Sequence, residues 1–497
     1  METVLVLADQ LRLDHGALAD RSPGDCRILI VEAQDKIAGR SWHRQRLHLF
    51  VAGLRKFARD ASAAGFEVDH RVDRSFRSAL SAHRAEFSPD RIVAMTPMNR
   101  TGRDVLDRAG VELVPNTQFS CSSDDFAVWA RGRRSLKMED FYRWQRVRLG
   151  LLMEGDDPAG GKWNHDHDNR KPPPRDGRAW PAVTRFERDD IDHAVLAEMA
   201  DRTDLTGDEP AGWWPTTRAE ALQRLDEFIA DALVPFGPFE DAMLSSEWKL
   251  AHSTLSTALN MGFLDPLEVA EAAIAAFERG DAPVNSVEGF VRQVIGWREY
   301  VYGLYWLWGD AGYAEQNALG ADRPVPPAFL GEPTQMRCVS TVIERLGRYG
   351  WNHHIERLMI IGNLALTAGI DPQAVTAWMW ETYVDGADWV MVPNVVGMAL
   401  HADGGRMATK PYASGGAYIS KMSDFCKGCH YDPKQRVGER ACPYTTLYWD
   451  FLARHEERFA RNHRMARQVA AMRRLADLDQ VRERAVEVRS RLDAGTL

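Results

Sequence analysis

The sequence predicts an α/β domain with a doubly wound parallel sheet, joined by a long linker to an all-helical C-terminal domain. In residues 1–125, short β-branched apolar runs alternate with helical stretches, which is the pattern of a parallel sheet covered by helices. From residue 216 onward the pattern is helical throughout, and a chain of 497 residues is too long for one small core. We therefore expect domains at 1–125 and 216–497, with the linker at 126–215.

Five apolar runs predict the strands of the sheet. They are Thr3–Ala8, Arg27–Val31, Phe66–Val72, Arg91–Met95 and Val111–Val114. Between them, Ser41–Ala61 carries apolar residues at helical spacing, and Thr101–Ala109 is a further helical stretch that ends at a glycine. This alternation indicates a Rossmann-like sheet, although no Gly-x-Gly-x-x-Gly fingerprint follows the first strand.

Three polar residues follow the predicted strands, at the edge where ligands of such sheets bind. They are Asp9, Gln10 and Glu32. Contact with a ligand and a plain role as a loop residue or helix cap fit each of them equally well.

The linker combines turn-rich and stiff segments, Asp156–Gly161 and Lys171–Pro174. It also contains the strongest basic-aromatic patch of the chain. The patch consists of Arg131, Arg133, Arg134, Lys137, Tyr142, Arg143, Trp144, Arg146 and Arg148. Phosphate contact and a solvated helix face are both consistent with this pattern.

Composition limits the class of protein. The net charge of −9 argues against a surface coated with basic residues for bulk nucleic-acid binding, but it leaves room for a local basic groove. No apolar run approaches the roughly 20 residues of a membrane span, so we expect no membrane association. The first residues lack a basic region and a cleavage signal. We expect a cytoplasmic protein, in which disulfides are rare and thiolate metal sites are plausible.

Four of the six cysteines could form a metal site. Cys426 and Cys429 form a Cys-x-x-Cys turn, Cys442 follows after twelve intervening residues, and Cys338 lies well upstream. A short turn can direct two thiolates at one centre, and thiolates select zinc or the iron of an iron–sulfur cluster. Spacing alone does not separate these metals, and buried structural cysteines or a redox dithiol are the alternatives.

Three other motifs lie in the helical half. In His252–Gly262, clustered hydroxyl groups at a helix start suit a pyrophosphate, or simply cap the helix. In Arg292–Tyr300, a planar cation and an acid lie beside aromatic residues. In the third, His353 and His354 precede Arg357 by four and three residues, so that on a helix they share a side with it. Paired histidines could bind zinc, but no acid near them in the sequence completes a usual zinc triad.

Taken together, these motifs resemble the photolyase/cryptochrome superfamily, and within it the iron–sulfur bacterial cryptochromes and prokaryotic (6-4) photolyases. The resemblance covers essentially the whole chain. The residues that carry it are Ser253–Ser256, Gly296–Tyr300, His353, His354, Arg357, Asp385–Asp388, Pro393–Met398 and the four cysteines.

The resemblance implies three cofactors: FAD in the helical domain, a [4Fe-4S] cluster, and a 6,7-dimethyl-8-ribityllumazine antenna in the α/β domain. The implied cluster ligands are Cys338, Cys426, Cys429 and Cys442. The implied FAD-binding residues are Ser253, Thr254, Leu255, Ser256, Gln293, Arg298, Arg357, Asp385, Asp388 and Asn394. The residues implied to face a DNA lesion are Glu299, His353, His354, Tyr412 and Tyr418. Trp378 matches the electron relay next to the flavin, and Asp9, Gln10 and Glu32 would contact the antenna.

The implied activity is light-driven repair of pyrimidine (6-4) pyrimidone photoproducts by electron transfer from photoexcited reduced FAD, as in a (6-4) DNA photolyase. His354 is the expected proton donor, and UV-damaged DNA is the expected partner of a monomer associated with the bacterial nucleoid. The alternative is a blue-light cryptochrome photoreceptor that has the same cofactors but signals. A third hypothesis is a nucleic-acid-binding iron–sulfur protein without photochemistry.

The chain departs from the family pattern at positions around the expected flavin. Met391 stands where relatives place an Asn or an acid near flavin N5, and Met379 follows Trp378 where relatives often carry Tyr. Leu330 replaces an expected tryptophan. These departures predict a rerouted or inefficient electron relay, with Trp380 or Trp389 as possible participants. Gly39 replaces an expected aromatic residue, which leaves occupancy by the antenna open.

Overall fold

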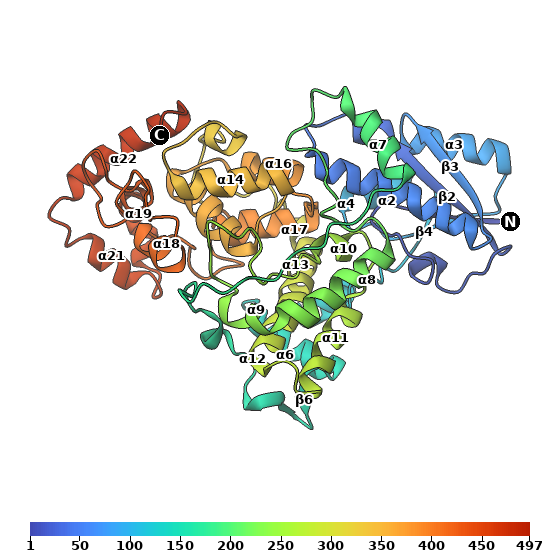
Figure 1. The fold of residues 1–497 in the computed structure, drawn as a ribbon, viewed down its shortest axis with the longest axis horizontal. Coiled ribbons are helices and arrows are strands. Elements are labelled where there is room, and N and C mark those ends of the chain that lie inside the picture. The colour runs from blue at the N-terminus through green and yellow to red at the C-terminus, as the bar shows by residue number, and fades with distance from the viewer.

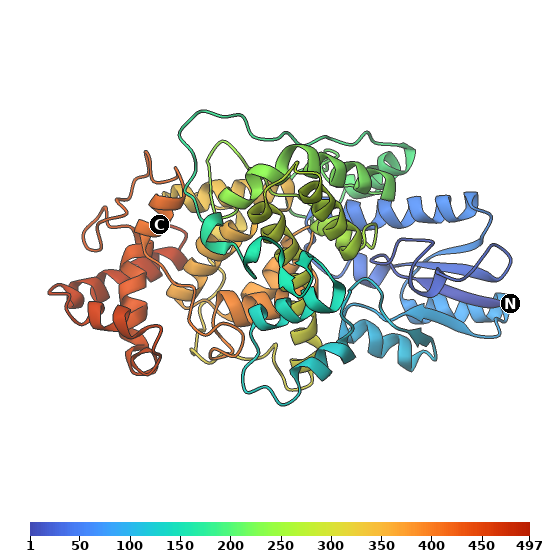
Figure 2. The same ribbon diagram turned by 90° about the horizontal axis from the view of Figure 1, so that it is seen from below.

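A computed structural model describes all residues, 1–497. The α/β domain with the N-terminus lies at one end of the molecule and the C-terminal helices lie at the other (Figure 1). Between them is a middle group of helices to which α6, α11 and α12 belong. Figure 2 shows residues 170–189 running along this helical part before the chain reaches α7 next to the α/β domain. No helix has the length and apolarity that a membrane crossing requires.

The sheet confirms the predicted fold class. All of its pairings are parallel and the strand order is β3-β2-β1-β4-β5, so the chain winds outward in both directions from β1. The strands are β1 (Glu2–Val6), β2 (Cys26–Ala33), β3 (Glu67–Asp73), β4 (Ile92–Met95) and β5 (Glu112–Val114). Each of the five predicted apolar runs thus overlaps one strand.

The two faces of the sheet enter different cores, because alternate side chains of a strand point to opposite faces. Val4 and Val6 belong to the same core as Leu54 of α2 (Arg44–Ala63). Leu5 belongs to a smaller core with Leu80 of α3. The remaining helices of this domain are α1 (Gln34–Ile37), α3 (Phe76–Phe87) and α4 (Arg100–Arg108).

The predicted linker contains regular structure as well as extended chain. Its elements are the end of α5 (Ser123–Ala130), then α6 (Met138–Leu149), β6 (Met153–Glu154), β7 (Asp157–Pro158) and α7 (Asp190–Ala200). The predicted basic-aromatic patch is divided, because Tyr142 and Arg146 of α6 are fully buried. The guanidinium of Arg146 donates to the backbone carbonyls of Leu151, Leu152 and Trp163. These two side chains are therefore not available to a phosphate.

The rest of the chain is helical, as predicted. The α-helices are α8 (Arg218–Glu227), α9 (Leu233–Phe239), α10 (Ser256–Asn260), α11 (Pro266–Glu278), α12 (Val284–Val291), α13 (Glu299–Gly309), α14 (Arg337–Tyr349), α15 (Asn363–Ala368), α16 (Pro372–Thr382), α17 (Asp388–Val392), α18 (Gly416–Met422), α19 (Pro443–Arg454), α20 (Glu456–Ala460), α21 (Ala466–Met472) and α22 (Leu478–Asp493). Short 3₁₀ turns occur at Gly16–Leu18, Ala159–Gly161, Asp166–Asn169 and Pro327–Leu330.

Four segments of the helical domain are π-helical: Phe228–Ala232, Arg292–Arg298, Glu356–Gly362 and Pro393–Ala399. Such segments are rare and occur frequently at functional sites, because the wider turn re-aims side chains. The last three contain Gln293, Arg298, Arg357 and Asn394, all of which the sequence motifs singled out.

Two large cores fill the molecule. One joins the sheet to the middle helices, since Val4 and Ile28 belong to the same apolar cluster as Val287 and Trp389. The other lies in the C-terminal half and packs α14, α15, α19 and α22 together. The boundary between the two predicted domains therefore passes through a continuous apolar interior.

Candidate functional site

A cavity lies where the carboxyl edge of the sheet meets the helical domain. It encloses about 580 Å³ of space, its open mouth included. Asp9 reaches it from the end of β1, and Met98 and Asn99 reach it from the chain after β4. The helical domain contributes the loop after α16 and the start of α17, with Asp385 and Asp388. The site thus lies at the edge of the sheet where α/β proteins bind ligands.

Asp385 is held by a dense set of hydrogen bonds at the cavity wall. The Arg357 guanidinium donates to both of its carboxylate oxygens, at 2.9 and 3.0 Å. The Ser256 hydroxyl donates to the same carboxylate at 2.7 Å, and the Asn260 side-chain amide donates to the backbone carbonyl of Asp385 at 3.0 Å. A bidentate pair fixes both orientation and distance. The structure thereby brings Arg357, Ser256 and Asp385 together, as the sequence motifs require.

Several polar atoms around this cavity are buried without a hydrogen-bond partner. They are the Thr257 hydroxyl, the Trp389 indole nitrogen, and Nε and one terminal nitrogen of the Arg298 guanidinium. The Arg298 guanidinium lies 4.1 Å from the centre of the Phe119 ring and 5.2 Å from that of Trp389. Buried polar groups normally have partners. This wall is therefore suited to a ligand that has both polar groups and a flat aromatic part.

The other residues expected at a cofactor do not line the cavity. Thr254 has a left-handed backbone, with φ of 56°, and its hydroxyl accepts from Arg224 at 3.1 Å. The helix that follows, α10, spans only five residues. Gln293 is half-buried, and the Asn394 amide donates to the Val390 carbonyl. Ser253 and Leu255 complete the turn that leads into α10.

The three residues expected at an antenna make different contacts. Asp9 faces the cavity, and burial raises its pKa to about 6. The Gln10 amide donates to the Met95 carbonyl at 3.2 Å. Glu32 is buried, which raises its pKa, but hydrogen bonds from Arg55 and His70 outweigh burial and lower the pKa to about 2. Both Glu32 oxygens are thus already occupied.

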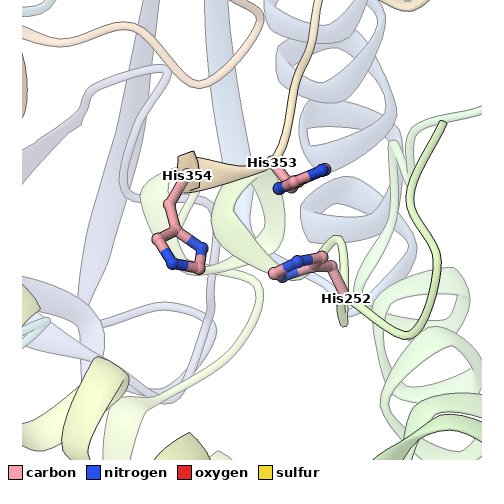
Figure 3. A group of neighbouring side chains, drawn as sticks. All are labelled: His252, His353 and His354. Atoms are coloured by element: carbon pink, nitrogen blue, oxygen red, sulfur yellow. The ribbon is translucent and has the colours of Figure 1, made fainter. Parts of the chain in front are cut away.

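Three histidines lie next to one another near Arg357. Figure 3 shows the rings of His252, His353 and His354, which come from two segments of chain about a hundred residues apart. One nitrogen of each ring lies within 4.8 Å of those of the other two. The His252 and His353 rings are stacked, with centroids 4.6 Å apart and planes at 11°. The sequence indicated His353 and His354 as a functional pair. It placed His252 only in the motif His252–Gly262.

The two stacked rings are buried, and several of their nitrogens are unpartnered. Both nitrogens of His353 and Nε2 of His252 have no hydrogen-bond partner. Burial lowers the pKa of both histidines well below the usual value, and the neighbouring histidines and Arg357 lower it further. These rings are therefore neutral at pH 7. His354 is about half exposed, and its Nε2 lies 3.3 Å from a carboxylate oxygen of Asp241.

Glu356 is a buried carboxylate beside His353. Its carboxylate lies 3.6 Å from Nε2 of His353 and forms an ion pair with Arg345. The Asn352 amide donates to its other oxygen at 3.2 Å. Burial raises the pKa of Glu356 to about 7, and Arg345 opposes that shift. Arg345 therefore compensates a carboxylate that has no access to water.

Removing this compensation should destabilise the fold. We expect Arg345→Met to lower the free energy of unfolding by about 3–5 kcal/mol, because it leaves the buried Glu356 carboxylate uncompensated. Urea denaturation followed by circular dichroism measures the change. Arg348→Met, on the exposed side of the same helix, is the control and should change stability by less than about 1 kcal/mol. Equal stability of the two variants would contradict the expectation.

The remaining residues expected at a lesion lie in different places. Burial raises the pKa of Tyr412 and Tyr418, and the Asp241 carboxylate adds to both shifts, which places the two tyrosines on the side of His354. Glu299 is elsewhere and fully buried. Its carboxylate oxygens accept the backbone N–H groups of Ser120 and Cys121 at 3.2 and 2.9 Å. The structure therefore does not bring Glu299 together with the histidines.

The four predicted cysteine ligands line one pocket of about 320 Å³. Cys338 comes from the first turn of α14, Cys426 and Cys429 from the loop after α18, and Cys442 from the start of α19. All four are free thiols. The other lining residues are Met336, Gly416, Ile419, Phe425, Tyr431, Pro443 and Tyr444.

The chemistry of this pocket fits a metal with thiolate ligands. Burial raises the pKa of Cys338 well above its usual value and that of Cys426 to about 12, and the neighbouring thiols add to both shifts. Thiols crowded in an apolar pocket are stabilised when a cation deprotonates and binds them. Gly416 allows the close approach, because a Cβ atom there would lie 2.8 Å from Sγ of Cys442.

Trp378 is buried between two aromatic rings. It stacks on Phe329, with centroids 5.1 Å apart, and lies edge-on to Tyr383 at 6.2 Å. Tyr383 in turn lies under the Arg357 guanidinium, 4.2 Å from the ring centre. Leu330 is 66% exposed, so the surface end of the expected relay carries no aromatic ring. Met379 and Met391 are both buried.

Comparison with known proteins agrees with this geometry. Residues 4–213 match the family described as deoxyribodipyrimidine photo-lyase-related protein. The chain is 40% identical over 490 residues to a (6-4) photolyase of Agrobacterium fabrum, which covers 96% of each chain. It is 37% identical over 101 residues to an uncharacterised protein of Acanthamoeba polyphaga mimivirus, which covers 20% of this chain and 75% of that protein.

Two solved structures share the fold. A class III photolyase from Agrobacterium tumefaciens has a TM-score of 0.60 at 16% identity, covering 99% of this chain and 98% of that one. A cryptochrome from Synechocystis sp. PCC6803 has a TM-score of 0.55 at 13% identity, covering 99% of each. The near full-length similarity to the A. fabrum protein, together with the motifs now seen side by side, shows that this chain belongs to the photolyase/cryptochrome family.

Proposed function

We propose that this protein repairs pyrimidine (6-4) pyrimidone photoproducts in DNA, in a reaction driven by light and by a bound FAD. The observation that carries the proposal is the histidine site beside the Arg357–Asp385 pair, with unpartnered ring nitrogens that no protein group satisfies. The 40% identity to a protein named (6-4) photolyase, over nearly the whole chain, supports the same function.

The residues around the cavity fit FAD. The unpartnered Thr257 hydroxyl, Trp389 indole and Arg298 guanidinium would hydrogen-bond the cofactor, and the cavity carboxylates would orient it. In its reduced form FAD supplies the light-driven transfer of an electron to the lesion. Arg357 holds the Asp385 carboxylate in a fixed position by two hydrogen bonds. The protein thereby positions the reacting groups before the substrate arrives.

His354 is the proposed proton donor. It is the only one of the three histidines with access to solvent and with a carboxylate partner, Asp241, at 3.3 Å. The contact with the Asp241 carboxylate fixes the orientation of the His354 ring. Each neutral ring, of His252 and of His353, would offer one N–H donor and one acceptor nitrogen to carbonyl or hydroxyl groups of the lesion.

The lesion must leave the duplex to reach this site, and weakened pairing of a damaged base makes that step cheaper. The side of the pocket that bears His354 carries basic groups suited to the phosphate backbone. Arg170 and Arg464 both act to lower the pKa of Lys410 and of Tyr412, which indicates that these basic groups lie near the tyrosine. Contacts of this kind would supply affinity without reading sequence.

The other two cofactors differ in how well the chain fits them. The four-cysteine pocket fits a [4Fe-4S] cluster, for which we propose a structural role, because it joins α14 to the segments around α18 and α19. The expected antenna residues do not fit one lumazine site, since Glu32 is already paired and only Asp9 faces the cavity. We assign no part of the reaction to an antenna.

Repair of a defined substrate tests the proposal. Reduced, FAD-containing protein is illuminated with an oligonucleotide that carries one (6-4) lesion, and restored thymines are counted by chromatography. Repair that requires light supports the function. No restored thymine under saturating light rejects it in favour of a cryptochrome photoreceptor, the alternative that the altered relay at Met379 and Leu330 leaves open. Purified protein without flavin absorbance would favour the third hypothesis, a non-photochemical iron–sulfur protein.

The relay assignment of Trp378 has its own test. Trp378→Phe should slow light-driven reduction of oxidised FAD by an external thiol several-fold, because Trp378 is the indole that stacks on Phe329 and lies edge-on to Tyr383. Absorbance of the flavin under illumination measures the rate. Repair by chemically reduced protein should stay unchanged. The control is Trp449→Phe, which changes an indole that packs against Tyr448. Equal photoreduction rates in the two variants would remove Trp378 from the relay.

A further inference from the structure

We propose that His252, His353 and His354 form a binding site for one divalent transition-metal cation of the zinc type. Their ring nitrogens lie within 4.8 Å of one another and converge from two segments of chain (Figure 3). Two of the rings are buried, and their nitrogens include three without any hydrogen-bond partner. Unpartnered buried imidazoles that lie next to one another have the composition of a metal site without its ion.

The ligand set selects the class of ion. Imidazole nitrogen suits zinc, copper and nickel, whereas magnesium prefers oxygen ligands and keeps its water. A carboxylate commonly orients a metal-binding imidazole through the ring's other nitrogen. Asp241 occupies that position, 3.3 Å from Nε2 of His354, although it is 113 residues away in the sequence. The fold therefore supplies an acid that the local sequence around His354 does not indicate.

The charges around the site are mixed, because Lys249 adds a positive charge near His252 and Asp241 adds a carboxylate near His354. The two nearby arginines are both committed to carboxylates, Arg357 to Asp385 by two hydrogen bonds and Arg345 to Glu356. Asp241 has no basic side chain other than His354 as a partner among the ion pairs. The carboxylate charge of Asp241 is thus available to offset part of the charge of a bound divalent ion.

Binding requires a small rearrangement. Nitrogens bound to one tetrahedral zinc lie about 3.3 Å apart, given bonds of about 2.0–2.1 Å, so the site must contract. The stacked rings of His252 and His353 also direct their nitrogens in parallel, and one ring must turn about its Cβ–Cγ bond. Because both nitrogens of His353 are unpartnered, turning that ring breaks no hydrogen bond.

Calorimetric titration of the cofactor-containing protein with zinc chloride tests the site, with magnesium chloride as the comparison ion. We expect one zinc per chain and no competition by magnesium. His252→Ala and His353→Ala should each weaken zinc binding at least tenfold, and Asp241→Asn should weaken it less. His193→Ala, on the exposed face of α7, is the matched control and should bind zinc like the wild type.

Two results would overturn the proposal. The first is that the wild type binds no zinc. The second is that His252→Ala and His353→Ala bind zinc as tightly as the wild type, in which case the zinc is an adventitious ion only. Flavin and iron content check that each variant is folded. Because a misfolded variant would also lose zinc, the wild type is loaded with Cu²⁺ and examined by electron paramagnetic resonance. Splitting from two or three ring nitrogens supports the site, and oxygen ligands alone overturn it.

One consequence rests on the proposed function. If His354 donates the proton in repair, a zinc ion on its ring should inhibit repair, and a chelator should restore it. Zinc that binds as expected but leaves repair unchanged would remove His354 as proton donor without removing the metal site. If instead no zinc binds but repair proceeds, the metal site is rejected and His354 remains the proposed proton donor. The two proposals can therefore fail separately.

Discussion

Cys338→Ala should abolish iron binding and destabilise the C-terminal half of the helical domain by more than about 4 kcal/mol. Cys338 is the one cysteine ligand from α14, and the other three come from segments around α18 and α19. Without it the remaining thiols cannot complete a four-ligand centre, and the loss of a structural metal is among the few single changes of this size. The variant also leaves a void in a pocket that is otherwise closed by apolar side chains.

Iron analysis, visible absorbance and thermal unfolding measure the effect. Cys26→Ala is the matched control, because Cys26 is equally buried but lies in β2, far from the other thiols. We expect it to retain full iron content and to lose only about 1 kcal/mol. Full iron content in Cys338→Ala would show that the four thiols do not act as one centre.

His354→Ala should lower the rate of (6-4) repair by about 10²–10⁴-fold, the usual contribution of a positioned proton donor. The change removes the solvent-accessible ring and leaves Asp241 without its partner. It does not touch the Arg357–Asp385 pair or the cavity wall, so FAD should remain bound. The measurement is the yield of restored thymine per absorbed photon at equal flavin content.

The control for this change is again His193→Ala, an exposed histidine outside the site, which should repair at the wild-type rate. His353→Ala separates two explanations of a positive result. If it is as inactive as His354→Ala, both rings contact the lesion. Undiminished repair by His354→Ala at full flavin content would remove the assignment of the proton donor.

The arrangement of the sheet could be predicted from the sequence because its signals are local. Runs such as Arg27–Val31 are apolar and rich in β-branched residues, and Ser41–Ala61 has apolar residues at helical spacing. Each segment therefore indicates by its own residues whether it forms a strand or a helix. The structure extends or shortens these elements by a few residues at their ends. The parallel direction follows from the helices between the strands, and all of the pairings confirm it.

The candidate site could be predicted only where its residues are neighbours in the chain or carry an unusual chemistry. The spacing of His353, His354 and Arg357 is local, and cysteines are few enough for Cys338 to be grouped with ligands about ninety residues away. His252 and Asp241 were missed as partners of His354, because no spacing within the sequence indicates which distant residues meet. The signal for His252 was its place beside Ser253, at the turn that enters the Asp385 cluster.

The same reasoning explains why some expected residues lie elsewhere. Glu299 adjoins Arg298 in a motif, but in the structure it accepts two backbone N–H groups of the segment that leads into α5. Glu32 follows a strand as a ligand-binding residue would, but Arg55 and His70 occupy it. The sequence shows that a residue is acidic, but it does not show whether the side chain meets a ligand or an arginine. That depends on how distant segments pack.

The apolar interior shared by the sheet and the middle helices has a consequence for how the molecule melts. Val4 and Ile28 belong to the same cluster as Val287 and Trp389, so neither half can open without exposing the other. We expect a single heat-absorption peak in scanning calorimetry for these regions, rather than one for each. An expressed fragment that stops near residue 125 should accordingly be insoluble, whatever its own sheet could do in isolation.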